Sequence, residues 1–316
     1  MRIVFMGTSA FAVPSLKLLA ASGDIEIALV VSQPDRPSGR GMRLTPTPVS
    51  AAAAELGLPL ETPERLRLIA DGVISLNADA LVVVSYGQIL STKVLNSARH
   101  GGINLHASLL PRWRGAAPIH RALASGDTHT GVATMRMERT LDTGAVLLES
   151  ILEIRSHHDA ETLEDELATL GAPLMLQTLR LLQEGNISER IQNHEDACYA
   201  HMLTREDGFI DFSVSTSEQV DRQVRAYAKR PGTSVIIGDK SLKVHAGYPT
   251  KDASASPPGT ITGTCKDGLI VATTSTDYVV TILQPPGKPA MSALAFANGA
   301  RLDYPLLAIK PTTVAT

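Results

Sequence analysis

Two polar side chains of the kind that perform carbonyl chemistry lie close together near position 105. Asn104 and His106 stand two positions apart in the stretch GGINLHASLLP. The stretch INLH is typical of a strand, and residues i and i+2 of a strand point to the same face, so an amide and an imidazole should converge there, with Leu105 on the opposite face. Such a pair also has a simpler interpretation, in which Asn104 satisfies a turn and His106 is a core histidine.

A carboxylate follows in the stretch LDTG at residues 141–144, which places Asp142 in a Gly-containing turn between two predicted strands. The commonest use of Asp in such a position is a structural Asx turn. The alternative is that the turn presents the carboxylate at a loop tip, where it joins Asn104 and His106.

An amide, an imidazole and a carboxylate together fit the transfer of an acyl group to an amine. Attack on a carbonyl builds an oxyanion, which the amide of Asn104 and a protonated His106 could both hydrogen-bond. Asp142 beside His106 would favour the protonated imidazole and could relay the proton that leaves the amine, directly or through water. The sequence has no GxSxG elbow, so it does not indicate a covalent acyl-enzyme.

The elements that must position these residues alternate between apolar runs and helical stretches. MRIVFMG at 1–7, IEIALVVS at 25–32, LVVVSYG at 81–87 and INLH at 103–106 read as buried strands, and helical segments such as PSLKLLAAS lie between them. This alternation predicts an α/β fold with a doubly wound, mainly parallel sheet. Ligands bind beyond the carboxyl ends of such strands, and His106 stands at one of these ends.

A long segment, QPDRPSGRGMRLTPTP at residues 33–48, separates the second strand from the next helix. Loops of this length are usually functional or disordered. It contains Arg36, Arg40 and Arg43 but only one acid, Asp35, so it predicts either a plain surface loop or a basic arm suited to phosphates. The GTSAF turn after the first strand lacks GxGxxG spacing, which argues against a dinucleotide.

From about residue 200 the pattern changes to short β runs separated by Gly and Pro, after a helical piece SEQVDRQVRAYA. Several short strands in succession predict a small antiparallel β barrel or sandwich. We therefore expect a catalytic domain over residues 1–190, a linker over 191–206 and a smaller C-terminal β-barrel domain over 207–316.

Composition and charge limit the class of protein. The chain has 316 residues, a net charge of −3 and 44% hydrophobic residues, which fits a folded protein and argues against one that coats nucleic acid indiscriminately. No apolar run of about 18 residues and no signal peptide is seen, so a cytoplasmic location without a membrane partner is expected. Cys198 and Cys265 lack CxxC partners, and Cys198 with His201 does not complete a ligand set, so no metal is expected.

The stretch NLHASLLPRWRGAAPIHRAL, the later LDTG and the QPDRPSGRG loop closely resemble the methionyl-tRNA formyltransferases. These enzymes belong to the formyltransferase family that uses 10-formyltetrahydrofolate. The NxH, SLLP and LDTG motifs are shared by the wider family, whereas the arginine loop and the C-terminal β domain with QPPGKPAMSA single out the tRNA branch. The resemblance covers nearly the whole chain.

The resemblance implies roles for individual residues. It implies that the catalytic residues are Asn104, His106 and Asp142. It implies folate contacts from the SLLP turn and from the backbone of the SYGQIL stretch, namely Ser108, Leu109, Leu110, Pro111, Tyr86, Ile89 and Leu90.

On the tRNA side, the resemblance implies that Arg40 helps to read the weak or absent first base pair of the initiator. Arg36 and Arg43 would contact phosphates, which position more than they specify. The C-terminal domain resembles an OB-type barrel, on which Arg225, Lys243 and Lys288 are candidates for the tRNA backbone. For each of these, a solvated surface charge is the simpler interpretation.

The expected function is transfer of a formyl group from 10-formyltetrahydrofolate to the amino group of methionyl initiator tRNA, by an enzyme expected to be a monomer. One alternative is a formyltransferase for a small molecule, either an aminosugar nucleotide or glycinamide ribonucleotide. The arginine loop and the C-terminal domain argue against it. Another alternative is a non-catalytic RNA-binding module, which the intact set of Asn104, His106 and Asp142 argues against.

Overall fold

The computed structural model describes residues 1–38 and 43–312, and the chain divides into two compact units. The first unit comprises Met1–Pro118, His129–Ile154 and Glu161–Ala200, and the second comprises Ile119–Thr128, Arg155–Ala160 and His201–Thr316. A single cut in the sequence does not reproduce this division, because two short segments that precede residue 161 belong to the second unit.

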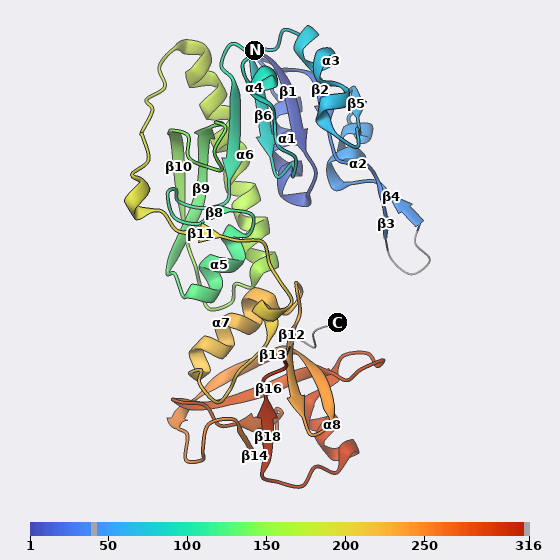
Figure 1. The fold of residues 1–316 in the computed structure, drawn as a ribbon, viewed down its shortest axis with the longest axis vertical. Helices are drawn as coiled ribbons and strands as arrows, with labels where there is room; N and C mark the ends of the chain where they lie inside the picture. The colour runs from blue at the N-terminus through green and yellow to red at the C-terminus, as the bar shows by residue number, and fades with distance from the viewer. Residues whose placement is uncertain (39–42, 313–316) are drawn as a thin grey trace. The chain divides into compact units, whose positions relative to one another are not determined.

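The first unit is built on a seven-stranded sheet with the strand order β10-β9-β7-β6-β1-β2-β5 (Figure 1). Neighbouring strands from β7 to β5 are parallel, while β9 and β10 extend the β7 edge in antiparallel pairs. The strands are β1 (Arg2–Gly7), β2 (Glu26–Val31), β5 (Leu60–Glu61), β6 (Ala80–Val84), β7 (Gly102–His106), β9 (His129–Arg136) and β10 (Val146–Glu153). The predicted doubly wound, mainly parallel α/β sheet is confirmed.

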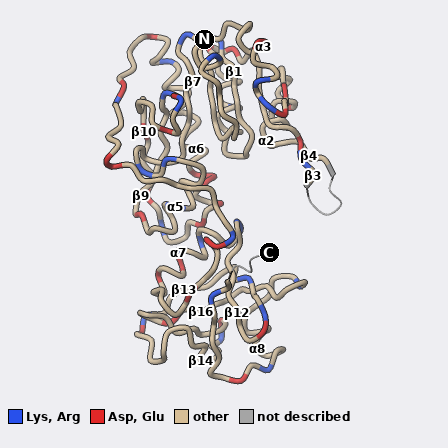
Figure 2. The backbone as a smooth tube through the Cα atoms, viewed as in Figure 1, with Lys and Arg blue, Asp and Glu red and all other residues tan. Residues whose placement is uncertain are grey.

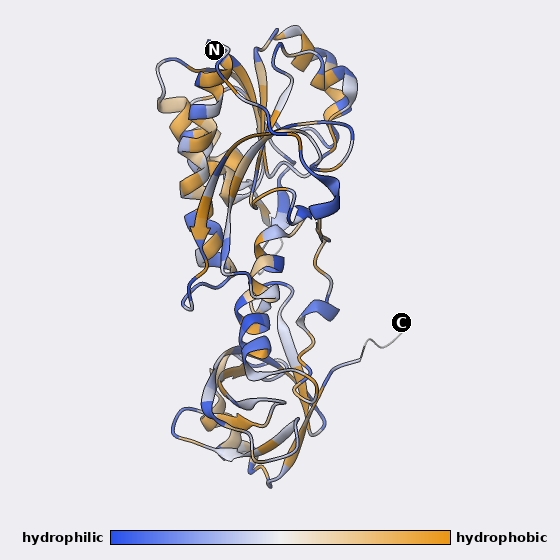
Figure 3. Cartoon of the chain, turned by 90° about the vertical axis from the view of Figure 1, so that its left-hand side faces the viewer, coloured by the Kyte–Doolittle hydropathy of each residue, from blue (hydrophilic) through white to orange (hydrophobic). Residues whose placement is uncertain are grey.

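Helices cover both faces of this sheet. The helices are α1 (Val13–Ala21), α2 (Pro48–Glu55), α3 (Ala70–Ser75), α4 (Thr92–Leu95) and α6 (Ala160–Glu184). On one face, Met6 and Val83 of the strands form a buried cluster with Val73 of α3 and Val94 of α4. Figure 3 shows the strands of the sheet mainly as hydrophobic, in agreement with their burial between two helical layers.

On the other face of the sheet, α6 lies directly against β7. A Cβ atom added to Gly171 of α6 would lie 2.6 Å from Cδ2 of Leu105, so glycine lets the helix approach β7 without a shift of the Leu105 side chain. The hydroxyls of Thr134 on β9 and Thr178 on α6 are 2.8 Å apart in the same layer. Because Gly171 packs on Leu105, α6 covers the face of β7 that carries the Leu105 side chain.

Two small two-stranded ladders supplement the main sheet. In the first, β8 (Arg114–Gly115) pairs in parallel with β11 (Tyr199–Ala200), which brings residues 191–200, expected as part of a linker, into the first unit. A Cβ atom on Gly115, whose φ is 120°, would lie 2.7 Å from the carbonyl oxygen of Ala200, so glycine is required at this pairing. In the second, β3 (Arg36–Ser38) pairs antiparallel with β4 (Arg43–Thr45), so the expected extended arm contains a short hairpin ladder.

The second unit contains a closed barrel of six antiparallel strands. The ring runs β13-β12-β18-β14-β15-β16 and closes through pairing of β13 with β16. The strands are β12 (Thr233–Ile237), β13 (Lys240–Ala253), β14 (Thr260–Thr264), β15 (Leu269–Val271), β16 (Thr276–Gln284), β18 (Leu306–Ile309) and the outer β17 (Met291–Ser292). The predicted barrel is confirmed, with one strand more than the five of an OB fold.

The helices of the second unit are α5 (Pro118–Ser125), α7 (Ser217–Tyr227) and α8 (Ala293–Ala300), and α7 packs against the barrel core through Val220 and Val224. A capping box between Thr216 and Gln219 begins α7. Short 3₁₀ turns are η1 (Ala10–Ala12), η2 (Leu66–Leu68), η3 (His194–Asp196) and η4 (Glu206–Gly208). Basic and acidic residues are interspersed along both units (Figure 2). None of the helices described is long and apolar enough to cross a bilayer.

Candidate active site

Asn104 and His106 share one face of β7, as the sequence predicted. Asn104 is in register with Val83 of β6, whose side chain lies in the buried cluster under α3 and α4. Leu105 points the other way, toward α6. The side chains of Asn104 and His106 therefore emerge together at the carboxyl end of β7, where ligands of parallel sheets bind.

The His106 ring is buried, with 6% of the residue exposed, and both of its nitrogens face protein oxygens. Its Nε2 atom lies 2.9 Å from the carbonyl oxygen of Trp113. A carbonyl can only accept, so Nε2 carries a proton and donates it to Trp113. The other nitrogen, Nδ1, lies 3.8 Å from Oδ2 of Asp142. The imidazole thus stands between a fixed acceptor and a carboxylate.

Asp142 lies in the turn between β9 and β10, as expected, but it is buried and directed into the protein instead of standing at an exposed tip. Its φ of 53° is in the left-handed region, which Asp tolerates better than most side chains. The carboxylate atom Oδ2 accepts a 2.8 Å hydrogen bond from the amide of Gly115. The turn and β8 therefore hold the carboxylate beside His106.

The side chain of Asn104 is half-buried and has no hydrogen-bond partner among the residues that the structure describes. Its two N–H donors and its carbonyl oxygen remain available to a ligand. Asn104, His106 and Asp142 thus form one constellation, and their catalytic roles stay predictions.

A buried polar network behind Asp142 was not predicted from the sequence. Gln192 donates from Nε2 to the carbonyl oxygens of Asp142 at 3.0 Å and Gly144 at 2.7 Å. Its Oε1 accepts from Nε and Nη2 of Arg114 at 3.0 and 2.8 Å, and Nη1 of Arg114 lies 3.1 Å from Nδ1 of His194. Arg114 lies within the stretch already quoted, but Gln192 carries no motif that would have revealed it.

The SLLP turn is folded mostly inward. Ser108 is buried and donates to the carbonyl oxygen of Arg112 at 2.6 Å, and Leu110 packs with Ala133 and Met135. Leu109 and Pro111 are only half-buried. A folate contact by this turn stays a prediction, and the side chains that remain partly accessible for it are those of Leu109 and Pro111.

The SYGQIL stretch exposes one of its three candidate residues. Tyr86 and Leu90 are buried in the cluster under α3 and α4, and burial raises the pKa of the Tyr86 hydroxyl to about 12. Ile89 is 93% exposed. Tyr86 and Leu90 can therefore offer a ligand only their backbone, which is the kind of contact expected of them.

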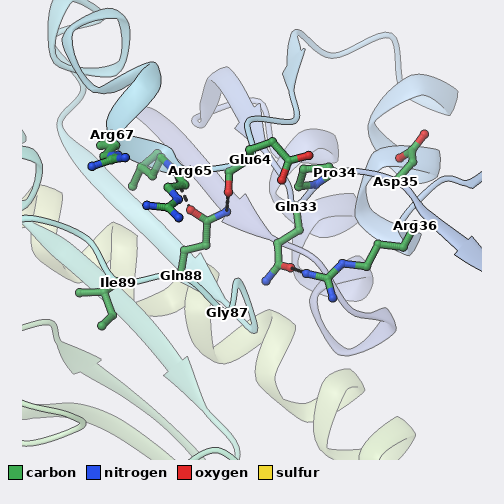
Figure 4. Close-up of a pocket in the computed structure, with 11 residues that line it drawn as sticks. Gln33, Pro34, Asp35, Arg36, Glu64, Arg65, Arg67, Gly87, Gln88 and Ile89 are labelled. Atoms are coloured by element: carbon green, nitrogen blue, oxygen red, sulfur yellow. Dashed lines mark hydrogen bonds between the residues drawn. The ribbon is translucent and has the colours of Figure 1, made fainter.

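A pocket of about 670 Å³ lies beside this stretch, beyond the carboxyl ends of β2 and β6 (Figure 4). Three arginines and two acids line it: Arg36, Arg65, Arg67, Asp35 and Glu64. Two glutamines fix its walls. Gln88 accepts from the amide of Leu66 at 2.8 Å, and Gln33 accepts from Nη2 of Arg36 at 2.9 Å. The pocket therefore has an excess of positive charge next to the exposed Ile89.

Of the three arginines predicted to bind tRNA, the structure describes the side chain of only one. Arg36 is exposed and directed toward Gln33 at the pocket (Figure 4). The backbone of Arg43 belongs to β4, and Arg40 lies outside the described residues. In the second unit, Arg225 is engaged by Asp221 at 2.8 Å and by the carbonyl oxygen of His158, so its side chain has a structural role. Lys243 and Lys288 are exposed.

Known proteins resemble this chain over most of its length. The formyl transferase family model matches residues 1–179, and the model of the formyl transferase C-terminal domain matches residues 202–301. The methionyl-tRNA formyltransferase of Marinobacter nauticus is 41% identical over 303 residues, covering 95% of this chain and 97% of the relative. That of Halorhodospira halophila is 42% identical over 302 residues, with 95% and 97% of the two chains covered.

Solved structures share the fold at low identity. A sugar 3N-formyl transferase, WlaRD, has a TM-score of 0.66 at 14% identity and covers 92% of this chain and 99% of its own. HypX from Aquifex aeolicus in complex with tetrahydrofolic acid has a TM-score of 0.64 at 14% identity, covering 94% and 47% of the two chains. Both structures match the fold of this chain over more than nine-tenths of its length.

Proposed function

Since the chain belongs to the formyl transferase family, we propose that it transfers the formyl group of 10-formyltetrahydrofolate to the amino group of methionyl initiator tRNA. The observation that carries this proposal is the 41% identity to methionyl-tRNA formyltransferases over 95% of the chain. The two-unit fold alone would not decide between substrates, because the sugar 3N-formyl transferase has a similar fold over 92% of this chain. The near-full-length identity favours the tRNA substrate.

In the transfer, the amine nitrogen attacks the formyl carbon and a C–N bond forms. The carbonyl oxygen becomes an oxyanion, and the amide of Asn104, which has no described protein partner, would donate to it. The bond from the formyl carbon to N10 of the folate then breaks. The attacking amine loses one proton and N10 gains one, so no covalent enzyme intermediate is required.

His106 and Asp142 handle the proton in this proposal. Donation from Nε2 to Trp113 holds the ring in one orientation, and Nδ1 faces the carboxylate of Asp142. A proton on Nδ1 is balanced by that carboxylate, so the imidazole can carry a positive charge next to the reacting carbonyl. Direct donation from Nε2 to the oxyanion requires that the bond to Trp113 be exchanged for a bond to the substrate.

The arginine-lined pocket is suited to the anionic end of a reduced folate. The glutamate portion of a folate carries carboxylates, and a guanidinium group can bind a carboxylate through two parallel N–H···O hydrogen bonds. Arg65 and Arg67 line the pocket together with Gln88 and Ile89, which belong to the stretch predicted to contact the folate. In this proposal the backbone of the SYGQIL stretch contacts the pterin, the SLLP turn also contacts the folate, and the carboxylates lie toward Arg65 and Arg67.

The arm around β3 and β4 is proposed to contact the acceptor stem of the tRNA, with Arg40 reading the first base pair and Arg36 and Arg43 meeting phosphates. The enzyme is proposed to act as a monomer in the cytoplasm, where its tRNA substrate is charged. Residues 1–190, together with 191–200 of the expected linker, would supply catalysis, and 207–316 would supply additional tRNA contacts.

A competition experiment tests the substrate assignment. The purified protein is given labelled 10-formyltetrahydrofolate with initiator Met-tRNA, elongator Met-tRNA and an aminosugar nucleotide in one reaction. We expect label on initiator Met-tRNA above both competitors. Label on the sugar nucleotide with none on Met-tRNA would establish the small-molecule alternative instead.

A further inference from the structure

Arg114 is a buried cation without a carboxylate partner. Only 1% of the residue is exposed, and its hydrogen bonds go to Gln192 and His194. Among residues 1–38 and 43–312, no carboxylate forms an ion pair with it. Buried charges are normally paired, because their desolvation is costly. The position of this cation directly behind the Asp142 turn therefore calls for an explanation.

The amide of Gln192 connects Arg114 to that turn. Its oxygen is fixed by two donors of one guanidinium, at 3.0 and 2.8 Å. The oxygen end must face Arg114, so the NH₂ end must face the turn, where both of its hydrogens have acceptors. These acceptors are the carbonyl oxygens of Asp142 and Gly144. Arg114 thus sets the orientation of the amide, and the amide in turn holds the backbone carbonyl groups on both sides of Thr143.

Asp142 is held from two directions by adjacent residues of one short strand. Gly115 donates its amide to the carboxylate, and its neighbour Arg114 holds the backbone of Asp142 through Gln192. The backbone of Asp142 is left-handed, with a φ of 53°, a conformation that other side chains tolerate poorly. The two contacts together determine where the carboxylate stands relative to Nδ1 of His106.

We propose that Gln192 is a positioning residue for formyl transfer, which keeps the Asp142 carboxylate in place beside His106 with Arg114 as its anchor. This inference rests on the proposed function for its kinetic readout. The competing explanation is that Gln192 serves only to neutralise Arg114 and to hold residues 191–200 in the fold.

The substitution Gln192→Glu separates the two explanations. A glutamate of the same length gives Arg114 a carboxylate, which offsets part of the stability that the lost hydrogen bonds supply. It cannot donate to the carbonyl oxygens of Asp142 and Gly144, so positioning should be lost. The matched control is His194→Ala, which removes the other partner of Arg114 and leaves the contacts to the turn intact.

We expect Gln192→Glu to lower kcat by about tenfold or more at unchanged KM for Met-tRNA and folate, in a protein whose thermal unfolding remains cooperative. His194→Ala should keep kcat within about threefold of wild type. Wild-type kcat in Gln192→Glu would overturn the proposal. So would a loss of kcat that His194→Ala reproduces, because then the state of Arg114, and not the turn, would matter.

A second readout needs no substrate. The imidazole NMR signals of His106 should shift in Gln192→Glu and stay in place in His194→Ala, since only the first change moves Asp142. Unshifted signals in Gln192→Glu would also overturn the proposal. If the protein were to formylate a different amine, this readout would be unaffected, and kcat would be compared on that amine.

Discussion

Nδ1 of His106 lies 3.8 Å from Oδ2 of Asp142, although the two residues are 36 positions apart in the sequence and belong to different elements. His106 ends β7, and Asp142 belongs to the turn between β9 and β10. Both side chains are about nine-tenths buried, so the carboxylate acts on the ring with little screening by solvent. The NxH and LDTG motifs therefore belong to one candidate site.

Replacing Asp142 with Asn keeps the shape of the side chain and removes its charge. We expect kcat to fall by roughly 10² or more, while the Tm changes little because an amide oxygen still accepts from Gly115. Single-turnover formylation measures the effect. Asp71→Asn, at an exposed acid paired with Lys93, is the control and should keep wild-type activity. Full activity in Asp142→Asn would show that Asp142 serves only as a structural residue of the LDTG turn.

The arginine-lined pocket predicts a change confined to folate binding. Arg65→Ala and Arg67→Ala should each raise KM for 10-formyltetrahydrofolate by about three- to tenfold, which corresponds to the loss of about 1 kcal/mol from a charge-assisted contact. The kcat at saturating folate should be unchanged. Arg99→Ala, at an exposed arginine outside the residues that line the pocket, is the control. Unchanged folate KM in both pocket variants would show that the folate carboxylates do not bind in this pocket.

For the basic arm around β3 and β4, we expect a change confined to the use of tRNA. Arg40→Ala should weaken productive use of initiator tRNA by about 1–3 kcal/mol if Arg40 reads base edges, and by less if it meets only phosphate. Folate affinity should be unaffected, because in this account the folate is held by the SLLP turn, the SYGQIL stretch and the arginines at positions 65 and 67. The measurement is kcat/KM for Met-tRNA at physiological salt. A wild-type value for the variant would contradict a role of Arg40 in tRNA recognition.

His120 makes the stability of the second unit depend on pH. Burial, together with the charges of Arg230 and Arg121, lowers the pKa of His120 from 6.5 to about 4. Between these values the unfolded chain binds more protons than the folded one, so stability rises with pH. The contribution of neutral His120 is fully present above about pH 6.5 and is lost as the pH falls toward 4.

Thermal unfolding at pH 7 and pH 5 checks this prediction. The drop in Tm between the two pH values should be smaller in His120→Gln than in the wild type, whereas His129→Gln, at an exposed histidine, should behave as the wild type does. An equal drop in His120→Gln would mean that the acid sensitivity arises elsewhere.

The sheet and the barrel were predictable because their signals are local and repeated. Buried runs such as Ala80–Val84, alternating with helices, specify a parallel sheet, and short β runs separated by Gly and Pro specify the barrel. The shared face of Asn104 and His106 follows from the two-residue period of a strand. The meeting of His106 with Asp142 was inferred from chemistry and from resemblance, not from spacing.

The network behind Asp142 could not be predicted in the same way. Arg114 and Gln192 are 78 positions apart and meet through side-chain hydrogen bonds that leave no periodic pattern in the sequence. The pairing of β8 with β11, which brings residues 191–200 into the first unit, involves only two residues in each strand. The burial of Tyr86 and Leu90 likewise depends on packing under α3 and α4, which a strand pattern does not specify.

The most direct test of the site is single-turnover formylation of initiator Met-tRNA by Asn104→Ala, with the dissociation constants of tRNA and folate measured on the same preparation. Asn104 is half-buried, and its amide has no described protein partner, so its removal should disturb the fold little. We expect the rate of transfer to fall by roughly 10² to 10³ while both dissociation constants stay unchanged. A rate within about threefold of wild type would show that Asn104 is a structural residue, and it would contradict the assignment of this constellation as the catalytic centre.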